Sequence, residues 1–337
     1  VRLDIRDGFF RRSDALSVRI ISSSPRQTMD IATASSPLES SSTDGMRVED
    51  RLTDVGGYRM RSLLIEAREN ADLPPVLFIH GASTSLLDPL NAFREPLEGR
   101  ASLFFVDRPG HGGSQAGPAE NRRPDGQAHA IARLMDERGI GRAIVVGHSY
   151  GGAVAAALAL EHPEKLRGLL LLSPVLYPWP GGIAWYYTAS AMPVFGWLFT
   201  RLVVPLAGRL AMESAARSVF SPDPLPAGYI EKTRAIEAIQ PAAFRHNARE
   251  IASLLDWTKE NARRYAKIAA NTIIVTGDTD DVVSPDIHSR QMAQAVPNAE
   301  LIVIPGLGHK PDYCATDMVI ASIEALARMP EHKPPIE

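Results

Sequence analysis

The chain alternates short runs of apolar residues with longer segments in which apolar residues recur at helical spacing. The short runs are apolar at successive positions, and each is followed by a turn that contains glycine, proline or polar residues. Such runs are typical of parallel strands that are buried on both faces of a sheet. The predicted strands cover residues 76–79, 103–106, 143–146, 169–172, 272–275 and 301–304.

Two further strands are predicted ahead of these runs, over residues 51–55 and 58–66, because they meet at Gly56–Gly57, a hairpin signal. Strands that alternate with helices form a doubly wound, mostly parallel sheet with right-handed crossovers. We therefore expect an α/β fold. The helices predicted from the spacing of apolar residues cover residues 125–138, 151–160, 288–295 and 317–327.

The alternation stops between residues 176 and 266, where no segment has the pattern of a strand. This stretch is helical or broken by proline, and an insertion of that size between two strands predicts a mainly helical cap. We expect the cap over the carboxyl ends of the strands, where ligands bind in such sheets. The expected core then comprises residues 48–175 and 267–330, and residues 331–337 form a tail.

The predicted cap is rich in large apolar side chains. Packing of the cap against the core is the ordinary explanation for each of them. Some could instead line an apolar cleft for an acyl chain or an aromatic group. A third explanation is contact with a membrane surface, but Arg201 and Arg209 are the only residues that support it. The apolar side chains are Tyr177, Trp179, Trp185, Tyr186, Tyr187, Phe195, Trp197, Leu198, Phe199, Leu202, Val203, Val204, Leu206 and Leu210.

Residues 1–47 have a different composition. Residues 22–45 are rich in serine, threonine, proline and aspartate, and their few large apolar side chains cannot offset the entropy cost of ordering. We interpret residues 1–47 as a disordered segment, with an anchor or a targeting element as the alternative. No run of about eighteen apolar residues occurs, so we expect no integral membrane segment.

The net charge and the cysteine content limit which binding partners and which cellular compartment we expect. The net charge is −3 over 337 residues, which predicts no nucleic-acid partner, since a basic surface is the usual sign of one. The lone Cys314 cannot form an internal disulfide and fits a reducing compartment, so we expect a cytoplasmic protein. No metal-ligand spacing or phosphate-binding motif is present, and we expect no cofactor and no metal. No feature predicts an oligomeric state.

The strongest chemical signal is the segment Gly147-His148-Ser149-Tyr150-Gly151, a G-x-S-x-G motif. It follows the predicted strand 143–146 and opens the predicted helix 151–160, which is the context that the motif requires. The glycines allow the strand and the helix to approach closely across a strained turn. The motif predicts that Ser149 is a nucleophile at the amino end of a helix.

With this motif the chain resembles the α/β-hydrolase family over residues 48–328. Residues 78–83 (Phe-Ile-His-Gly-Ala-Ser) resemble the oxyanion loop of that family, and residues 106–114 resemble its D-x-x-G-x-G-x-S turn. The family order of serine, acid and histidine implies an acid after the penultimate strand, where Asp280 fits best. Asp281 and Asp278 are the alternatives. The histidine implied in the loop after the last strand is His309.

The resemblance implies a serine hydrolase that needs no cofactor. Ser149 would attack, His309 would act as general base and acid, and Asp280 would orient the imidazole. The backbone N–H groups of Ala82 and Tyr150 would stabilise the oxyanion. His148, inside the motif, is expected to have a packing or supporting role.

A hydrophobic small molecule is the expected substrate, and the simplest expected reaction is hydrolysis of a carboxylic ester through an acyl-enzyme. Thioester, lactone, amide and carbon–carbon hydrolysis, acyl transfer and haloperoxidase-like chemistry are alternatives with the same three residues. Ser149 argues against the haloalkane dehalogenases and epoxide hydrolases of the family, which carry aspartate at that position. A non-catalytic binding protein on the same fold is the alternative from another class.

Overall fold

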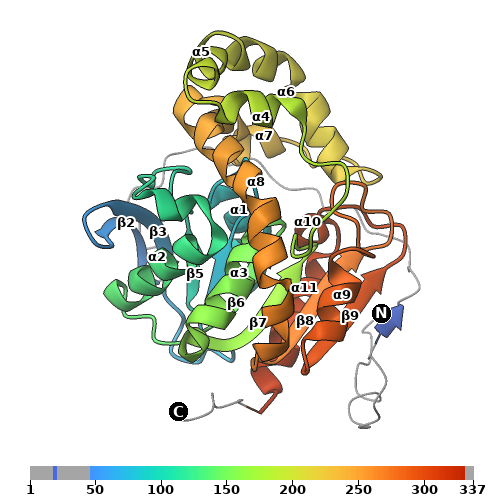
Figure 1. The fold of residues 1–337 in the computed structure, drawn as a ribbon. Coiled ribbons are helices and arrows are strands. Elements are labelled where there is room, and N and C mark those ends of the chain that lie inside the picture. Colours follow the sequence, from blue (N-terminus) through green and yellow to red (C-terminus); the bar gives the residue numbers. More distant parts are fainter. Residues whose placement is uncertain (1–17, 21–45, 331–337) are drawn as a thin grey trace.

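A single sheet organises the chain. The computed structural model describes residues 18–20 and 46–330 (Figure 1). Within them nine strands are ordered β1-β9-β8-β7-β6-β4-β5-β3-β2, and only the pairs β2/β3 and β3/β5 are antiparallel. The strands are β1 Val18–Ile20, β2 Val48–Asp54, β3 Arg59–Ile65, β4 Val76–Ile79, β5 Leu103–Val106, β6 Ala143–His148, β7 Leu166–Leu172, β8 Thr272–Gly277 and β9 Ala299–Ile304.

Helices cover both faces of this sheet, and each face has its own apolar core. Successive residues of a strand enter different cores: Leu77 of β4 packs with α2, α3 and α9, whereas Phe78 packs with α1 and α11. The predicted doubly wound, mostly parallel α/β sheet is therefore confirmed. The helices of the core are α1 Leu87–Leu97, α2 Pro124–Glu137, α3 Tyr150–Glu161, α9 Ser289–Ala295, α10 Pro311–Cys314 and α11 Thr316–Arg328, with short 3₁₀ helices η1 Ala119–Arg122 and η2 Pro163–Lys165.

Helix α1 and strand β1 were not predicted, and neither were the short helices η1, η2 and α10. Helix α1 contains Pro89 and Pro96, which disguise its helical spacing. Pro89 lies in the first turn, where a missing N–H costs little. Strand β1 lies within the segment 1–47 that we expected to be disordered, and it pairs in parallel with β9 from Val18↔Leu301 to Ile20↔Val303. That prediction is wrong at β1. A three-residue strand is too short to be recognised in the sequence, and it forms here because the open edge of the sheet at β9 provides backbone hydrogen-bond partners. The rest of the segment up to residue 45, and the predicted tail 331–337, lie outside the described residues.

Between β7 and β8 the chain leaves the sheet and forms a group of helices. Figure 1 shows them over one end of the sheet, with α8 descending along the core and α5 and α6 farthest away. The helices are α4 Trp185–Ala191, α5 Phe195–Leu202, α6 Val204–Phe220, α7 Tyr229–Lys232, η3 Ala235–Ile239, α8 Pro241–Asn261 and η4 Ala262–Lys267. We refer to residues 176–266 as the cap.

The apolar side chains of the cap divide into two groups. Tyr177 and Trp179 pack against the core, as expected. The expectation of packing against the core is wrong for a second group, because these side chains are exposed on or next to α4, α5 and α6, whose main contacts are with one another, with α8 and with η3. The exposed members are Trp185, Tyr186, Phe195, Trp197, Leu198, Leu202, Val203, Leu206 and Leu210.

In the described part of the chain, no single helix is both long and apolar enough to cross a bilayer. Helices α5 and α6 meet such a test only when they are taken together, and the chain bends by 62° between them.

Candidate active site

Ser149 lies at a sharp turn between β6 and α3. Its backbone has φ 54° and ψ −117°, a conformation that non-glycine residues rarely adopt. Hydrogen bonds hold the turn in place: Ser149 N donates to Leu172 O at 2.9 Å, and Gly152 N donates to Ser149 O at 3.0 Å. The surrounding structure thus imposes the strained conformation, as is common at functional sites.

The glycines around Ser149 are required by close backbone contacts. A Cβ on Gly147 would lie 2.4 Å from Gly151 O, and a Cβ on Gly151 would lie 2.3 Å from Ile79 O. Both distances are far below van der Waals contact. Helix α3 can therefore start directly against β4 and β6 only because these positions lack side chains.

Asp280 and His309 come together from the loops that follow β8 and β9. Asp280 Oδ2 lies 2.8 Å from His309 Nδ1, and both side chains are buried. The other oxygen of Asp280 accepts the N–H groups of Val282 and Val283 at 2.9 and 2.8 Å. Burial raises the pKa of Asp280, but the hydrogen bond from His309 and the two amides outweigh burial and leave the pKa below its ordinary value.

The two alternative acids have other positions. Asp278 and Asp281 are both exposed. Asp278 Oδ1 accepts the N–H of Gly306 at 2.6 Å and so stabilises the turn that leads to His309. Of the three carboxylates in this loop, the structure places Asp280 against the imidazole.

Strands β6, β7, β8 and β9 are neighbours in the sheet, so their carboxyl ends bring the turn at Ser149 and the loops of Asp280 and His309 to one edge. His148 connects the turn to the histidine loop. Its Nε2 lies 2.9 Å from His309 O, and the two rings are 4.9 Å apart between centroids. Burial holds the pKa of His148 well below its usual value, so the ring is neutral and Nε2 donates to that carbonyl.

The loop after β4 lies beside Ser149. A Cβ on Gly81 would lie 3.4 Å from Ser149 Cβ. Ala82 is the next residue of the same loop. Tyr150 is the first residue of α3, where helical N–H groups have no partner within the helix. The loop at Ala82 and the start of α3 at Tyr150 therefore flank Ser149.

Arg108 connects the parts of this region and was not singled out by the sequence. It is completely buried in the turn after β5. Its Nε donates to His80 O at 3.1 Å and its Nη2 donates to Gly81 O at 3.0 Å. The guanidinium also lies 4.4 Å from the centroid of the Tyr150 ring. Arg108 thus supports both the loop at Gly81 and the start of α3.

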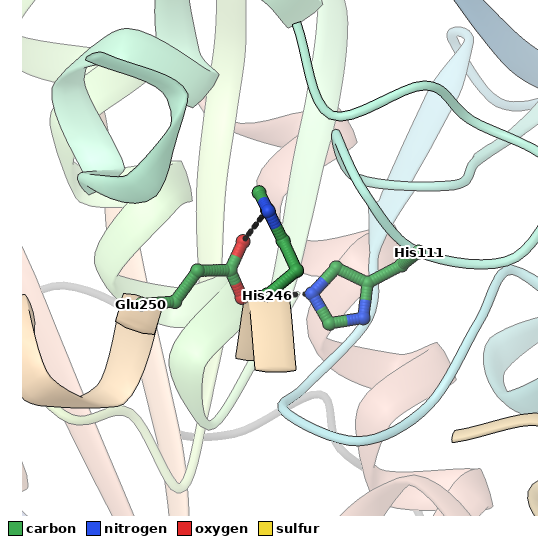
Figure 2. Close-up of side chains that lie close together, drawn as sticks. All are labelled: His111, His246 and Glu250. Atoms are coloured by element: carbon green, nitrogen blue, oxygen red, sulfur yellow. Dashed lines mark hydrogen bonds and ion pairs between the residues drawn. The ribbon is translucent and has the colours of Figure 1, made fainter. Parts of the chain in front are cut away.

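Glu250 of the cap helix α8 balances this buried charge. Its Oε2 accepts Arg108 Nη1 at 3.1 Å and His111 Nε2 at 2.7 Å, while Oε1 accepts Gln127 Nε2 at 2.6 Å and His246 Nε2 at 3.1 Å. Figure 2 shows the two imidazole rings approaching the carboxylate. Burial alone would raise the pKa of Glu250, but Arg108 holds it well below the ordinary value. The carboxylate is ionised and all four of its donors come from fixed positions.

A second contact from α8 reaches the same loop. Asn247 Oδ1 accepts Ser83 N at 3.1 Å, and Asn247 Nδ2 donates to Ser83 Oγ at 2.9 Å. Ser83 has φ 56°, so this pair of bonds stabilises another strained residue. The only sequence signal for Asn247 and Glu250 is the polar segment that begins at His246, four residues before Glu250 on the same face of α8.

Two groups of buried side chains have the geometry of metal ligands in the described residues: His111, His246 and Glu250, and Asp88, His148 and Asp312. Each already contains a buried cation. Arg108 is bonded to Glu250, and Lys310 Nζ lies 2.9 Å from Asp88 and 2.8 Å from Asp312. A divalent metal would meet these positive charges at contact distance, so neither group fits a metal ion.

The sequence model described as the alpha/beta hydrolase fold matches residues 74–311. The chain belongs to the α/β-hydrolase family. This match includes the loop at Gly81, the turn at Ser149, the cap and the loops of Asp280 and His309. The resemblance that the sequence motifs suggested is therefore confirmed.

Known proteins similar to this α/β hydrolase differ in their named activities. The dihydrolipoyllysine-residue acetyltransferase component of an acetoin cleaving system from Cupriavidus necator is 36% identical over 145 residues, which are 43% of this chain and 37% of that protein. Lipase 3 from a Moraxella species is 25% identical over 264 residues, 77% of this chain and 78% of the lipase.

Among solved structures, 2-hydroxy-6-oxo-6-phenylhexa-2,4-dienoate hydrolase from a Rhodococcus species has a TM-score of 0.66 at 19% identity. The alignment covers 84% of this chain and all of that structure, at 100%. At this identity the likeness shows the fold alone. Hydrolases are thus among the relatives of this chain.

We predict that Glu250→Gln lowers the free energy of unfolding by about 3–5 kcal/mol, because Arg108 is left buried without a counter-charge. Urea unfolding at neutral pH measures this. Glu260→Gln on the same helix is the matched control: Glu260 pairs with Arg123 in an exposed ion pair, and its loss is expected to cost about 0–1 kcal/mol. Equal losses in both variants would show that the buried pair is not special.

We also predict a pH dependence that comes from His111. Burial lowers its pKa to about 4 in the folded chain, against 6.5 as the ordinary value. At pH values between 4 and 6.5, His111 therefore takes up a proton when the chain unfolds. Its contribution to the free energy of unfolding is fully present above pH 6.5 and is lost as the pH falls towards 4. As the pH falls through this window, the free energy of unfolding of His111→Gln is expected to decrease less steeply than that of the wild type. The two slopes are expected to differ by about 1.4 kcal/mol per pH unit. An unchanged slope would mean that His111 is charged in the folded chain.

Proposed function

We propose that the chain is a cofactor-free serine hydrolase that cleaves carboxylic esters through an acyl-enzyme. The observation that carries this proposal is the hydrogen bond of 2.8 Å between Asp280 and His309 at the sheet edge where Ser149 lies on its strained turn. Membership of the α/β-hydrolase family supports the same roles for these three residues.

The reaction follows from the chemistry of the three groups. Ser149 Oγ attacks the ester carbonyl while His309 Nε2 takes its proton. Asp280, which is ionised and held by two backbone amides, keeps the proton of His309 on Nδ1 and stabilises the imidazolium that forms. His309 then protonates the leaving alcohol, and in the second half of the reaction it activates water for attack on the acyl-enzyme.

The developing oxyanion would be stabilised by the backbone N–H groups of Ala82 and Tyr150. Their spacing depends on the loop at Gly81, which Arg108 and Asn247 hold from two sides. These two side chains are positioning residues in the proposal, since neither is assigned a contact with the substrate.

An apolar substrate fits the underside of the cap. Tyr187 of α4 and Phe244 of α8 stack with 5.9 Å between ring centroids. Tyr187 is close enough to Ser83 for their hydroxyl groups to interact, and burial raises its pKa to about 12, so the phenol stays neutral. These rings therefore place aromatic surface next to the loop that would carry the oxyanion donor.

We predict that Ser149→Ala abolishes hydrolysis of p-nitrophenyl esters, with a loss in kcat of about 10⁴-fold or more. A series from acetate to palmitate, with burst and steady-state rates, would also give the acyl length that the site prefers. Labelling of the wild type by a fluorophosphonate without turnover of any ester would replace ester hydrolysis by another reaction of the same nucleophile. Wild type that neither turns over nor labels would contradict the proposal.

We predict that Asp280→Asn lowers kcat by about 10⁴-fold, because the amide cannot stabilise the imidazolium and favours the wrong tautomer of His309. Asp281→Asn is the matched control. Asp281 is the adjacent, exposed carboxylate, and its substitution is expected to change kcat by less than about twofold. The same ester assay compares the two, and an equal loss in Asp281→Asn would remove the assignment of Asp280.

A further inference from the structure

The cap exposes an apolar surface, much of it on α5 and α6, the cap helices farthest from the sheet in Figure 1. Eleven of the fourteen exposed large apolar side chains in the described residues lie between Trp185 and Leu210. We call this surface the outer cap face. Its members are Trp185, Tyr186, Met192, Val194, Phe195, Trp197, Leu198, Leu202, Val203, Leu206 and Leu210.

The most exposed side chains follow helical spacing. Leu198 and Leu202 are four residues apart on α5, and Leu206 and Leu210 are four residues apart on α6, so each pair lies on one side of its helix. Leu202, Leu206 and Leu210 are 71%, 69% and 81% exposed. Figure 1 shows both helices at the end of the molecule farthest from the sheet. The leucines are therefore exposed on the two helices at the tip of the cap.

Helix α6 is unusual in how little of it is covered. It is 17 residues long, and only Val204 and Phe220, at its two ends, are buried. A helix with this composition ordinarily buries one side against a core. Many exposed large apolar side chains in one part of a protein mark an interaction site, since leaving them in water costs free energy.

The charges on α5 and α6 are mostly positive, with Arg201, Arg209 and Arg217 against one acid, Glu213. No aspartate or glutamate occurs from Lys165 to Met212, whereas Arg201 and Arg209 lie among the exposed leucines of α5 and α6. Arg201 lies over the ring of Trp197 with 4.4 Å to its centroid. The first acid after this stretch is Glu213, which pairs with Arg217 at 2.7 Å. The two helices that carry most of the outer cap face thus have a net positive charge.

We propose that the outer cap face docks on the surface of a bilayer that contains anionic phospholipid. Exposed leucines and aromatic rings would enter the boundary between headgroups and acyl chains, and Arg201 and Arg209 would meet lipid phosphates. Trp185 and Trp197, both exposed, supply the amphipathic rings that are typical of this depth.

The helices lie on the bilayer in this proposal and do not cross it. Helix α5 has 8 residues, and α6 carries Arg209, Glu213 and Arg217 within its 17. A spanning helix needs about 20 residues that are predominantly apolar. The bend of 62° between α5 and α6 instead allows both to follow one plane.

A second copy of the chain is a poorer occupant than a lipid surface. In a twofold interface the same face meets itself. Helices α5 and α6 carry three arginines and one acid, so a net positive face would then meet a net positive face, and like charges at an interface are repelled. An anionic headgroup would instead place negative charge opposite Arg201 and Arg209.

The test is flotation of the full chain with vesicles of phosphatidylcholine, with and without phosphatidylglycerol. We expect the wild type to bind the anionic vesicles more tightly and to lose this preference at high salt. Leu206→Asp with Leu210→Asp is expected to lower the partition coefficient by about tenfold or more, since both side chains leave the acyl region. Arg201→Gln with Arg209→Gln is expected to reduce binding to the anionic vesicles only.

Leu52→Asp is the matched control, because Leu52 is an exposed leucine on β2, outside the cap. It should bind as the wild type does, and thermal unfolding of each variant checks that it is folded. The fluorescence of Trp185 and Trp197 should shift to shorter wavelength on binding, and the shift should be lost when both are replaced by tyrosine.

Three results would overturn the proposal. The wild type could fail to float with either vesicle, or Leu52→Asp could weaken binding as much as the double leucine variant does. The wild type could also be a dimer by light scattering that Leu206→Asp with Leu210→Asp dissociates, without binding to vesicles. The outer cap face would then be an interface between copies of the chain.

Discussion

The buried ion pair between Arg108 and Glu250 is the interaction on which the arrangement of the site depends. Arg108 belongs to the core, and Glu250 belongs to the cap helix α8. Neither charge is exposed, so either one alone would be buried without compensation, at a cost that is a large fraction of the small net stability of a protein. The cap is therefore held in one position relative to the core. Because Arg108 also bonds the carbonyls of His80 and Gly81, the same interaction holds the loop that lies beside Ser149.

The cap has two sides with different physical character. Its inner side combines the stacked rings of Tyr187 and Phe244 with fixed polar contacts: Glu250 is satisfied by four donors, and Asn247 makes two bonds to Ser83. Its outer side, at α5 and α6, is apolar and makes few contacts with the rest of the described chain. The exposed leucines of α5 and α6 are separate from Asn247 and Glu250 of α8, so a partner could bind the outer cap face without replacing the contacts that these two residues make with the core. An enzyme placed in this way on a lipid surface would have a rigid site and a separate docking element.

Strain and burial act together around Ser149. The turn at Ser149 and the loop at Ser83 both have positive φ, and each is stabilised by hydrogen bonds from another segment. The acid and base loops are restrained in the same way, since Asp278 bonds Gly306 and His148 bonds the carbonyl of His309. Fixed donors and fixed side chains need no reorganisation when charge develops in a transition state. The arrangement is therefore suited to a reaction that passes through an oxyanion.

The sequence by itself determined the alternation of strands and helices, the turn at Ser149 and the place of the cap, because each depends on local periodicity or on glycines at fixed spacing. It favoured Asp280 among three neighbouring aspartates only through a resemblance, and the contact of Asp280 with His309 is decided by the fold. The tertiary structure alone decided the partnership of Arg108 with Glu250, which are 142 residues apart. It also decided that the leucines of α5 and α6 are exposed. An apolar pattern predicts a face that avoids water, but which surface covers that face depends on packing between segments that no local pattern encodes.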